Sequence, residues 1–371
     1  MNNENLKYQI GITLIRGIGS TLAKNLIAYI GSVEGVFHEK RKNLAKIPGI
    51  GDILSAEIAS QQVIDRAEKE ICFIEKNKIR PLFYTDREYP FRLKECADSP
   101  VMIYTKGDCD LNNSRLVGIV GTRNATETGK ENCRKLIADL ALSLPNTFIV
   151  SGLAYGIDIC AHKAALENGL PTIGVVAHGL DRVYPAAHRS TATKMVHQGA
   201  LLTEYLSQTN PDRPNFVQRN RIIAGLSDAI IVVESAVRGG ALITAEAANE
   251  YNRDVFAFPG RVSDEWSGGC NALIKNNNAS LIESADDIIR FMNWEKQNLG
   301  DQVFQPSLFP YLSDDEQEIV GALRLRAEGI QVNELAIATT KPFSKISSLL
   351  LEMEFKGIVK CLPGGIYKIV K

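Results

Sequence analysis

Residues 116–158 read LVGIVGTRNATETGKENCRKLIADLALSLPNTFIVSGLAYGID, and this stretch decides the fold. Two apolar runs, 116–120 and 147–150, flank a segment with the length and polarity of a helix. Continuous apolar strands that alternate with helices are typical of a parallel sheet covered on both faces. We therefore predict an α/β protein with a central doubly wound, extended Rossmann-like sheet.

The same alternation continues to residue 293 and defines the central domain, residues 66–293. Ahead of it, a helix to about residue 77 and two short strands, 80–84 and 101–104, lead into the sheet. The strands predicted for the sheet proper are 116–120, 147–150, 172–176, 200–203, 229–233, 254–258 and 280–282.

Residues 1–65 contain a near-repeat with one G-x-G turn in each copy, at Gly17-Ile-Gly19 and at Gly49-Ile-Gly51. Each copy reads as a helix, a tight turn and a second helix, which resembles the helix-hairpin-helix motif of SAM-like modules. Such a turn exposes backbone N–H groups at a helix start, where a phosphate can bind. Small helical units of this kind also serve only as packing modules. Both interpretations stay open.

The C-terminal part separates from the rest at residues 294–312, whose glycine, prolines and amides indicate a linker. Residues 313–371 then begin with Ser313-Asp-Asp-Glu316, a capping-box signature. Three helices, near 314–326, 332–339 and 343–356, precede a hairpin, which is the pattern of a winged helix. Its acidic and basic residues balance in number, so the sequence does not decide whether this domain contacts protein or DNA.

Composition narrows the class of protein. The 371 residues carry a formal net charge of -1, so any nucleic-acid site must be a local concentration of positive charge. Seven scattered cysteines without a C-x-x-C pair fit buried free thiols in a reducing compartment, not a disulfide frame or a zinc site. No leader and no membrane-spanning apolar run is present, so we expect a cytoplasmic protein without membrane contact.

Three loops of the central domain should meet at one edge of the sheet, because ligands of open parallel sheets bind outside the carboxyl ends of the strands. They offer small residues, hydroxyls and helix N-termini, which together would form an anion cradle. Dinucleotide and P-loop signatures are both absent from them. The candidate cradle residues are Gly121, Thr122, Arg123, Ser151, Gly152, Gly156, Gly239, Gly240 and Thr244.

The densest basic feature is Arg219-Asn220-Arg221, three residues after Phe216. On a helix the two arginines point about 200° apart, so both reach one ligand only if they precede the helix; otherwise one is a structural pin. Guanidinium groups suit phosphates, and Phe216 or Tyr155 can stack a base. Which arginine faces a strand stays open.

Catalytic chemistry is not evident. Asp158 and His162 are four residues apart and can form a pair on a helix surface, and we assign them, with Glu234, a structural or orienting role. The spacing of His178, His188 and His197 does not match helical metal ligation. We therefore expect no catalytic residue, no metal and no cofactor.

These motifs together resemble the DprA/Smf family of bacterial DNA-processing proteins. The resemblance covers nearly the whole chain and runs in order through the following segments: 119–123, 149–158 with Ala161 and His162, 179–181, Tyr184-Pro185, Phe216 with 219–226, 233–234, 239–245, 258–260 and 268–274. It implies a non-enzymatic protein that binds single-stranded DNA without sequence preference. It also implies RecA loading during natural transformation and recombination, displacement of single-strand-binding protein, and a homodimer formed through the Rossmann-like domain.

Two positions depart from that family. Many members have Lys or Arg where this chain has Tyr155, and Pro where it has Val217. We expect a weaker electrostatic share of binding, offset by stacking on Tyr155. Transformability of the host, the role of the winged helix and the RecA-contacting surface stay open.

The alternative function is that of a nucleotide-processing hydrolase of the lysine-decarboxylase-like type. That family has P-G-G-x-G-T-x-x-E, and residues 238–246 are similar only in part, because Arg238 and Ile243 replace its proline and third glycine. These larger side chains crowd the backbone where a phosphate would approach, so the DNA-binding function is preferred.

Overall fold

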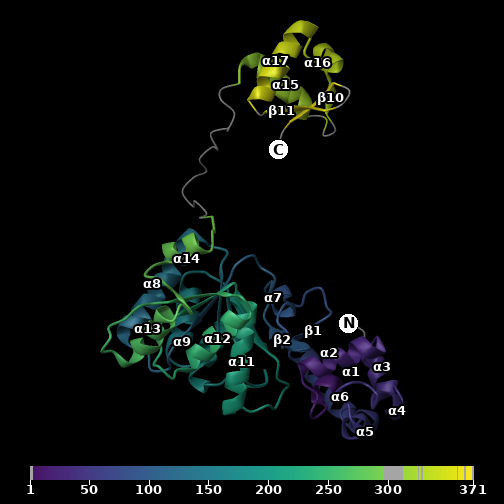
Figure 1. The fold of residues 1–371 in the computed structure, drawn as a ribbon, viewed down its shortest axis with the longest axis vertical. Helices are drawn as coiled ribbons and strands as arrows, with labels where there is room; N and C mark the ends of the chain where they lie inside the picture. Colours follow the sequence, from purple (N-terminus) through teal and green to yellow (C-terminus); the bar gives the residue numbers. More distant parts are fainter. Residues whose placement is uncertain are drawn as a thin grey trace. The chain divides into compact units, whose positions relative to one another are not determined.

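The computed structural model describes residues 3–295, 312–324, 326, 329–356, 358–362 and 365–369. It divides into two compact units, Met1–Gln297 and Asn298–Lys371 (Figure 1). The first holds the N-terminal helices and the large sheet, and the second is the small C-terminal domain. Most of the predicted linker, residues 296–311, lies outside the described residues.

The N-terminal helices form two hairpins that pack against each other. A Cβ atom placed on Gly17 would lie 3.1 Å from Leu54, and one on Gly49 would lie 3.1 Å from Leu22. Both glycines have positive φ, 86° and 84°, so the near-repeat corresponds to two equivalent turns that face each other. The helices are α1 (Asn3–Leu14), α2 (Ser20–Ile30), α3 (Val33–His38), α4 (Arg41–Leu44), α5 (Asp52–Ser60) and α6 (Ile64–Lys76).

Helix α6 shows that the N-terminal module is not separate from the sheet. The predicted domain start at residue 66 falls inside this helix, which packs along α1. Its buried residues Ala67, Ile71 and Ile74 share one hydrophobic cluster with the α1–α5 side chains and with Met102 and Tyr104 of the sheet. The module and the sheet therefore have a common core.

The sheet has nine strands in the order β1-β2-β6-β5-β4-β3-β7-β8-β9. Strands β3 to β9 are parallel, whereas β1 and β2 are antiparallel and form one edge. The strands are β1 (Arg80–Phe83), β2 (Met102–Lys106), β3 (Leu116–Val120), β4 (Phe148–Ser151), β5 (Thr172–Val175), β6 (Gly199–Thr203), β7 (Ala229–Val232), β8 (Asp254–Ala257) and β9 (Ser280–Leu281). The doubly wound fold predicted from the apolar runs is confirmed.

Helices cover both faces of the sheet. Figure 1 shows these helices around the sheet. One cluster of buried side chains includes residues of α11 and α12, and another includes residues of α8, α9 and α14. Strand order reverses between β3 and β7, so the loops after these strands flank the crevice where doubly wound sheets bind ligands. The helices are α7 (Phe91–Lys94), α8 (Glu127–Ser143), α9 (Ile157–Glu167), α10 (Arg189–Gln198), α11 (Arg213–Leu226), α12 (Gly240–Glu250), α13 (Gly268–Lys275) and α14 (Ala285–Phe291), with short 3₁₀ turns at Ala186–His188 and Glu265–Ser267.

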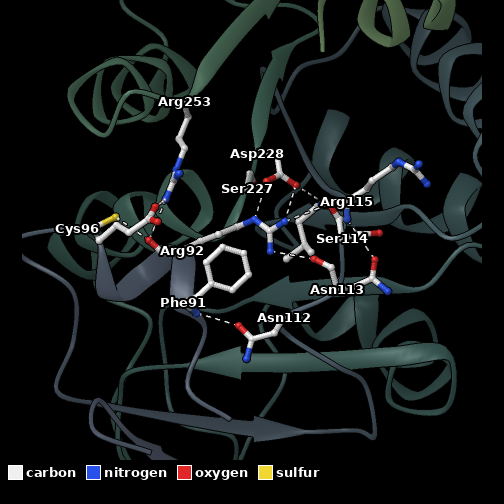
Figure 2. A network of polar contacts seen from close by, with 12 residues as sticks. Phe91, Arg92, Cys96, Asn112, Asn113, Ser114, Arg115, Ser227, Asp228 and Arg253 are labelled. Carbon is white, nitrogen blue, oxygen red and sulfur yellow. Dashed lines mark hydrogen bonds and ion pairs between the residues drawn. The ribbon is translucent and has the colours of Figure 1, made fainter. Parts of the chain in front are cut away.

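The amino ends of β3 and β7 are held by a buried arginine (Figure 2). Arg92 of α7 donates to both carboxylate oxygens of Asp228, at 2.7 and 2.9 Å, and to the carbonyl of Asn113 at 2.9 Å. Asp228 also accepts from the Leu116 backbone N–H at 2.8 Å. This network fixes α7 to the two central strands.

The C-terminal unit is a winged helix, as predicted. Ser313 and Glu316 exchange backbone and side-chain hydrogen bonds, which is the expected capping box. A short strand that the sequence pattern did not reveal joins the hairpin as a third strand, and Leu335 and Ile346 lie in the core between the helices. The elements are α15 (Asp314–Arg324), β10 (Ile330–Gln331), α16 (Val332–Ala338), α17 (Phe343–Phe355), β11 (Val359–Leu362) and β12 (Ile366–Ile369).

The cysteines are less uniformly buried than expected. All are free; Cys96, Cys133, Cys160 and Cys270 are buried, whereas Cys72 and Cys361 are exposed and Cys109 is half-buried. Over the part of the chain that the structure describes, no helix combines the length and apolarity needed to cross a bilayer.

Candidate nucleic-acid interface

An exposed arginine stacked on an aromatic ring marks the carboxyl edge of the sheet. Arg123 follows β3, and its guanidinium carbon lies 5.1 Å from the ring centroid of Phe216 in the first turns of α11. The Tyr184 ring, nearly half exposed, lies 6.0 Å from the Phe216 ring. Arg123 has no acidic partner among the described residues, so its charge is available to a ligand.

Tyr155 adds a second exposed ring. It precedes the N-terminus of α9, is 50 % exposed, and meets His188 edge to face at 4.9 Å. The His188 ring is itself held by a hydrogen bond between Nδ1 and the Leu153 carbonyl at 2.8 Å. Tyr155 is thus supported from beneath while its own face stays open, as a base-stacking side chain requires.

The two arginines of α11 do not act together. Both lie within the helix, so they diverge, and Arg219 is only 3 % exposed. Arg219 donates from Nη1 to the Val175 carbonyl at 2.8 Å and is the structural pin that the spacing allowed. Burial is the main cause that lowers its pKa to about 10, so it stays charged at neutral pH.

Arg221 is committed elsewhere. Its guanidinium forms an ion pair with Glu204 and donates to the Asp98 carbonyl at 2.8 Å, on the side of α11 that faces α7. Burial raises the pKa of Glu204, and the Arg221 charge opposes that shift. Arg221 is therefore placed to hold α11 against the rest of the domain, away from Arg123 and Phe216.

The predicted cradle hydroxyls face inward. Ser151 donates its hydroxyl to the Ile119 carbonyl at 2.6 Å and is fully buried. Thr244 is 1 % exposed on the inner face of α12. Thr122 is the more accessible hydroxyl, and it accepts from the Asn124 backbone N–H at 3.1 Å.

The cradle glycines serve close packing. A Cβ atom on Gly152 would lie 1.7 Å from Arg219 Nη1, and one on Gly156, where φ is 77°, would lie 2.1 Å from the Thr122 carbonyl. At Gly121 the same atom would meet Ile157 at 2.5 Å. These loops do converge, as predicted, but their small residues allow them to pack on one another and leave no open cradle at those positions.

Gly239 and Gly240 lie apart from that contact, at the start of α12. Gly240 is exposed, and its carbonyl accepts from the half-buried Asn220 side chain at 3.4 Å. This contact places the start of α12 beside α11.

The residues assigned to orientation have separate roles. Glu234 accepts from the backbone N–H of Thr126 at 2.9 Å and from its hydroxyl, and so fixes the start of α8. The expected surface pair of Asp158 and His162 is wrong, because both side chains are buried and have other partners. Asp158 accepts from the Ala154 N–H at 3.3 Å, and burial raises its pKa.

His162 lies beneath the site as a neutral ring. Its Nδ1 contacts the Thr172 hydroxyl at 2.7 Å, while Nε2 has no partner. Burial, assisted by the charge of Arg219, lowers its pKa to about 3. Within the described ranges, no group of three His, Cys, Asp or Glu side chains is arranged to hold a metal ion.

The sequence interpretation missed a basic groove between α8 and α9. This pocket has a volume of about 780 Å³, and its basic lining residues are Arg123, Lys130, Arg134 and Lys163. Lys130 and Arg134 are one turn apart on α8, which the sequence does show. Their proximity to Lys163 depends on how α8 packs against α9.

Two family models match the chain. The one described as DNA recombination-mediator protein A matches residues 80–293, and the one described as the DprA winged helix domain matches residues 305–365. A putative DNA processing protein DprA from Mycobacterium tuberculosis is 31% identical over 352 residues, which are 91% of this chain and 88% of that protein. The DNA processing protein DprA of Streptococcus pneumoniae is 43% identical over 201 residues, 54% of this chain and 70% of that protein.

Solved structures agree with these matches. The structure of DprA from S. pneumoniae superimposes with a TM-score of 0.67 at 34% identity, over 78% of this chain and 97% of that one. DNA processing protein A from Helicobacter pylori, studied for its single-stranded DNA binding mode, gives a TM-score of 0.53 at 28% identity over 58% of this chain and 96% of that one.

Proposed function

The chain belongs to the DprA/Smf family of DNA recombination mediators, and from that premise we propose that it binds single-stranded DNA without sequence preference and loads RecA onto the strand. The observation that carries the proposal is the exposed contact of Arg123 with Phe216, 5.1 Å apart at the carboxyl edge of the sheet. A cation beside an aromatic ring serves a phosphate and the adjacent base at once.

The chemistry of this edge favours a strand over a duplex. Tyr155 and Tyr184 are about half exposed. Tyr184 lies 6.0 Å from the Phe216 ring, and Tyr155 lines the same pocket as Arg123. A base can stack on such rings only when it is free of a complementary strand, and every base has a face to offer. Stacking combined with phosphate contact therefore predicts binding to single strands of any sequence.

The test is an oligonucleotide-binding assay with single-stranded and double-stranded DNA over a range of salt concentrations. We expect tighter binding of single strands and a log–log salt slope of about 0.7 per phosphate contacted. Arg123→Ala should weaken binding and reduce the slope, whereas Lys135→Ala, which removes a charge from the exposed side of α8, should do neither. Equal affinity of Arg123→Ala and the unchanged protein for oligo-dT would exclude this site.

RecA loading is tested by filament assembly on DNA covered with single-strand-binding protein. We propose that the chain displaces that protein locally, so its addition should shorten the lag before RecA assembles. Arg123→Ala should restore the lag in proportion to its lost affinity. An unchanged lag with the intact chain would contradict the loading function without touching the DNA-binding one.

A homodimer formed through the Rossmann-like domain is part of the proposal. Light scattering of the full chain at micromolar concentration should give about twice the mass of one chain. A monomer at concentrations that saturate DNA would contradict it.

We propose no enzymatic activity. The segment compared with the hydrolase motif has the Thr244 hydroxyl buried on the inner face of α12 and Ile243, 40 % exposed, where that motif has glycine. Glu246 is exposed on the same helix, without a partner in the described residues. Steady release of free base from AMP that Glu246→Gln abolishes would establish the hydrolase instead.

A further inference from the structure

The basic groove between α8 and α9 begins at the proposed stacking site. Arg123, Tyr155 and Gly156 line its near end, and the lining continues along α9 as far as Glu167. Eleven residues separate Gly156 from Glu167, which is about 16 Å along a helix at 1.5 Å per residue. The groove is thus long enough for more than one nucleotide beyond Arg123.

Unpaired positive charge lines both walls. Arg134 projects from α8 and Lys163 from α9, both are exposed, and neither has an acidic partner among the described residues. Lys130 is held at 2.7 Å by the exposed Glu127, and Glu167 is the one acidic residue in the lining. In a chain of net charge -1 this is a local excess of cations around one cavity.

The floor of the groove differs from its walls. Ile159 lies on α9 between the charged side chains and is partly exposed, and the nearly buried Cys160 and Ala164 complete a small, apolar floor. Such a surface suits sugars and base edges, while long basic side chains on the rims reach backbone phosphates. Asn124, at the Arg123 end, is the one amide side chain in the lining, so contacts further along the groove should not depend on base identity.

We propose that this groove carries the single strand onward from the Arg123–Phe216 contact, with Arg134 and Lys163 as ligands of successive backbone phosphates. The inference rests on the proposed function and extends its site. The ligand is a polynucleotide backbone, because Arg123, Lys130 and Arg134 follow one another from the loop after β3 along α8.

The experiment compares two charge-neutralised proteins. Arg134→Gln with Lys163→Gln removes the groove cations, and Lys135→Gln with Lys194→Gln removes the same charge from exposed positions on α8 and α10 outside the lining. Each is titrated with oligo-dT of about 6 and about 16 nucleotides, lengths that span the range of single-strand site sizes. All four positions are exposed, so both proteins should melt like the unchanged chain.

We expect the groove variant to bind the short oligonucleotide normally and the long one about 3- to 10-fold more weakly, with a salt slope lower by about 1.4 for two lost phosphate contacts. The control variant should match the unchanged chain with both oligonucleotides. AMP at micromolar concentration should not compete with the long oligonucleotide.

The other outcomes separate the two proposals. If Arg123→Ala weakens binding but the groove variant behaves like the control with the long oligonucleotide, the groove is excluded and the proposed function stands. If the unchanged chain binds neither oligonucleotide, the groove inference and the proposed DNA-binding function are both contradicted. Competition by AMP that the groove variant abolishes would overturn the inference in favour of a free-nucleotide pocket.

Discussion

The two ends of strand β3 use arginine in opposite ways. At the amino end, Arg92 is 3 % exposed and is enclosed by Asp228 and backbone carbonyls (Figure 2). At the carboxyl end, Arg123 is exposed, and its guanidinium lies over the Phe216 ring without an acidic partner in the described part of the chain. A buried guanidinium needs all its partners from the protein, because desolvation is costly, whereas an unpaired exposed one keeps its capacity for a ligand.

The same contrast extends to the neighbouring arginines. Arg253 donates to the Arg92 carbonyl and to Glu95, each at 2.9 Å, and Arg221 pairs with Glu204. Counting arginines near a site therefore overestimates its positive charge. The useful quantity is the number of cations that the fold leaves without an acidic partner.

The largest effect is expected from breaking the Arg92–Asp228 ion pair at the amino end of β3. Arg92→Ala should lower the free energy of unfolding by about 3 kcal/mol, because it removes a buried guanidinium and leaves the partly buried Asp228 carboxylate without its counter-charge. Urea unfolding followed by circular dichroism measures this. DNA affinity of the protein that remains folded should be unchanged, and a loss below about 1 kcal/mol would show that the network contributes little to stability.

The next largest effect is expected at the carboxyl end of β3, where we propose that DNA binds. Phe216→Ala should cost about 1–3 kcal/mol of binding free energy for single-stranded DNA, the usual value of one stacked base, with little change in stability. The salt slope should stay constant, because no phosphate contact is removed. Phe216→Tyr is the matched control and should keep the affinity; a reduced slope in Phe216→Ala would mean that the ring acts only by positioning Arg123.

The buried His162, beneath the proposed DNA site, should make the stability of the protein depend on pH. Its pKa is about 3 in the folded chain against 6.5 unperturbed, so the unfolded chain takes up a proton as pH falls below 6.5 while the folded chain does not. The stability contribution is present above pH 6.5 and is lost toward pH 3, by about 2 kcal/mol between pH 7 and pH 5. His162→Gln should lack this part of the acid sensitivity in urea titrations at the two pH values; parallel losses in both proteins would contradict the shift.

The smallest effect is expected from a substitution that frees Lys130 from its ion pair with Glu127. Glu127→Gln releases Lys130 within the groove, and exposed pairs of this kind contribute little to stability. We expect unchanged unfolding and about 2-fold tighter binding of a long single strand at low salt, which fades as salt rises. Glu131→Gln, which removes a neighbouring exposed charge outside the lining, is the control.

Much of the fold follows from local pattern. The strands lie within one or two residues of the predicted ranges, because runs such as Leu116–Val120 are apolar throughout and a strand buried on both faces requires that. The winged helix and the Ser313–Glu316 capping box follow from equally local signals. The boundary predicted at residue 66 falls inside α6, since the apolar face of a helix does not reveal which neighbour it packs against.

The candidate site was less predictable. Arg123, Phe216 and Tyr155 lie at the expected edge. Arg219, Arg221 and Ser151 turn inward to protein partners, and Thr244 is buried. Sequence shows that a side chain can donate a hydrogen bond but not which acceptor receives it. Tyr184, Arg134 and Lys163 could be assigned to the candidate site only from the tertiary structure, because they lie on segments that are far apart in the chain.

By itself, then, the sequence determined the alternation of strands and helices and the two flanking small domains, because these depend on the local hydrophobic period. It also determined the edge of the sheet where a ligand would bind, because that edge follows from the direction of parallel strands. Only the tertiary structure decided which cations stay free, because charge pairing and burial are set by contacts between residues far apart in the chain, such as Arg92 with Asp228 and Arg221 with Glu204.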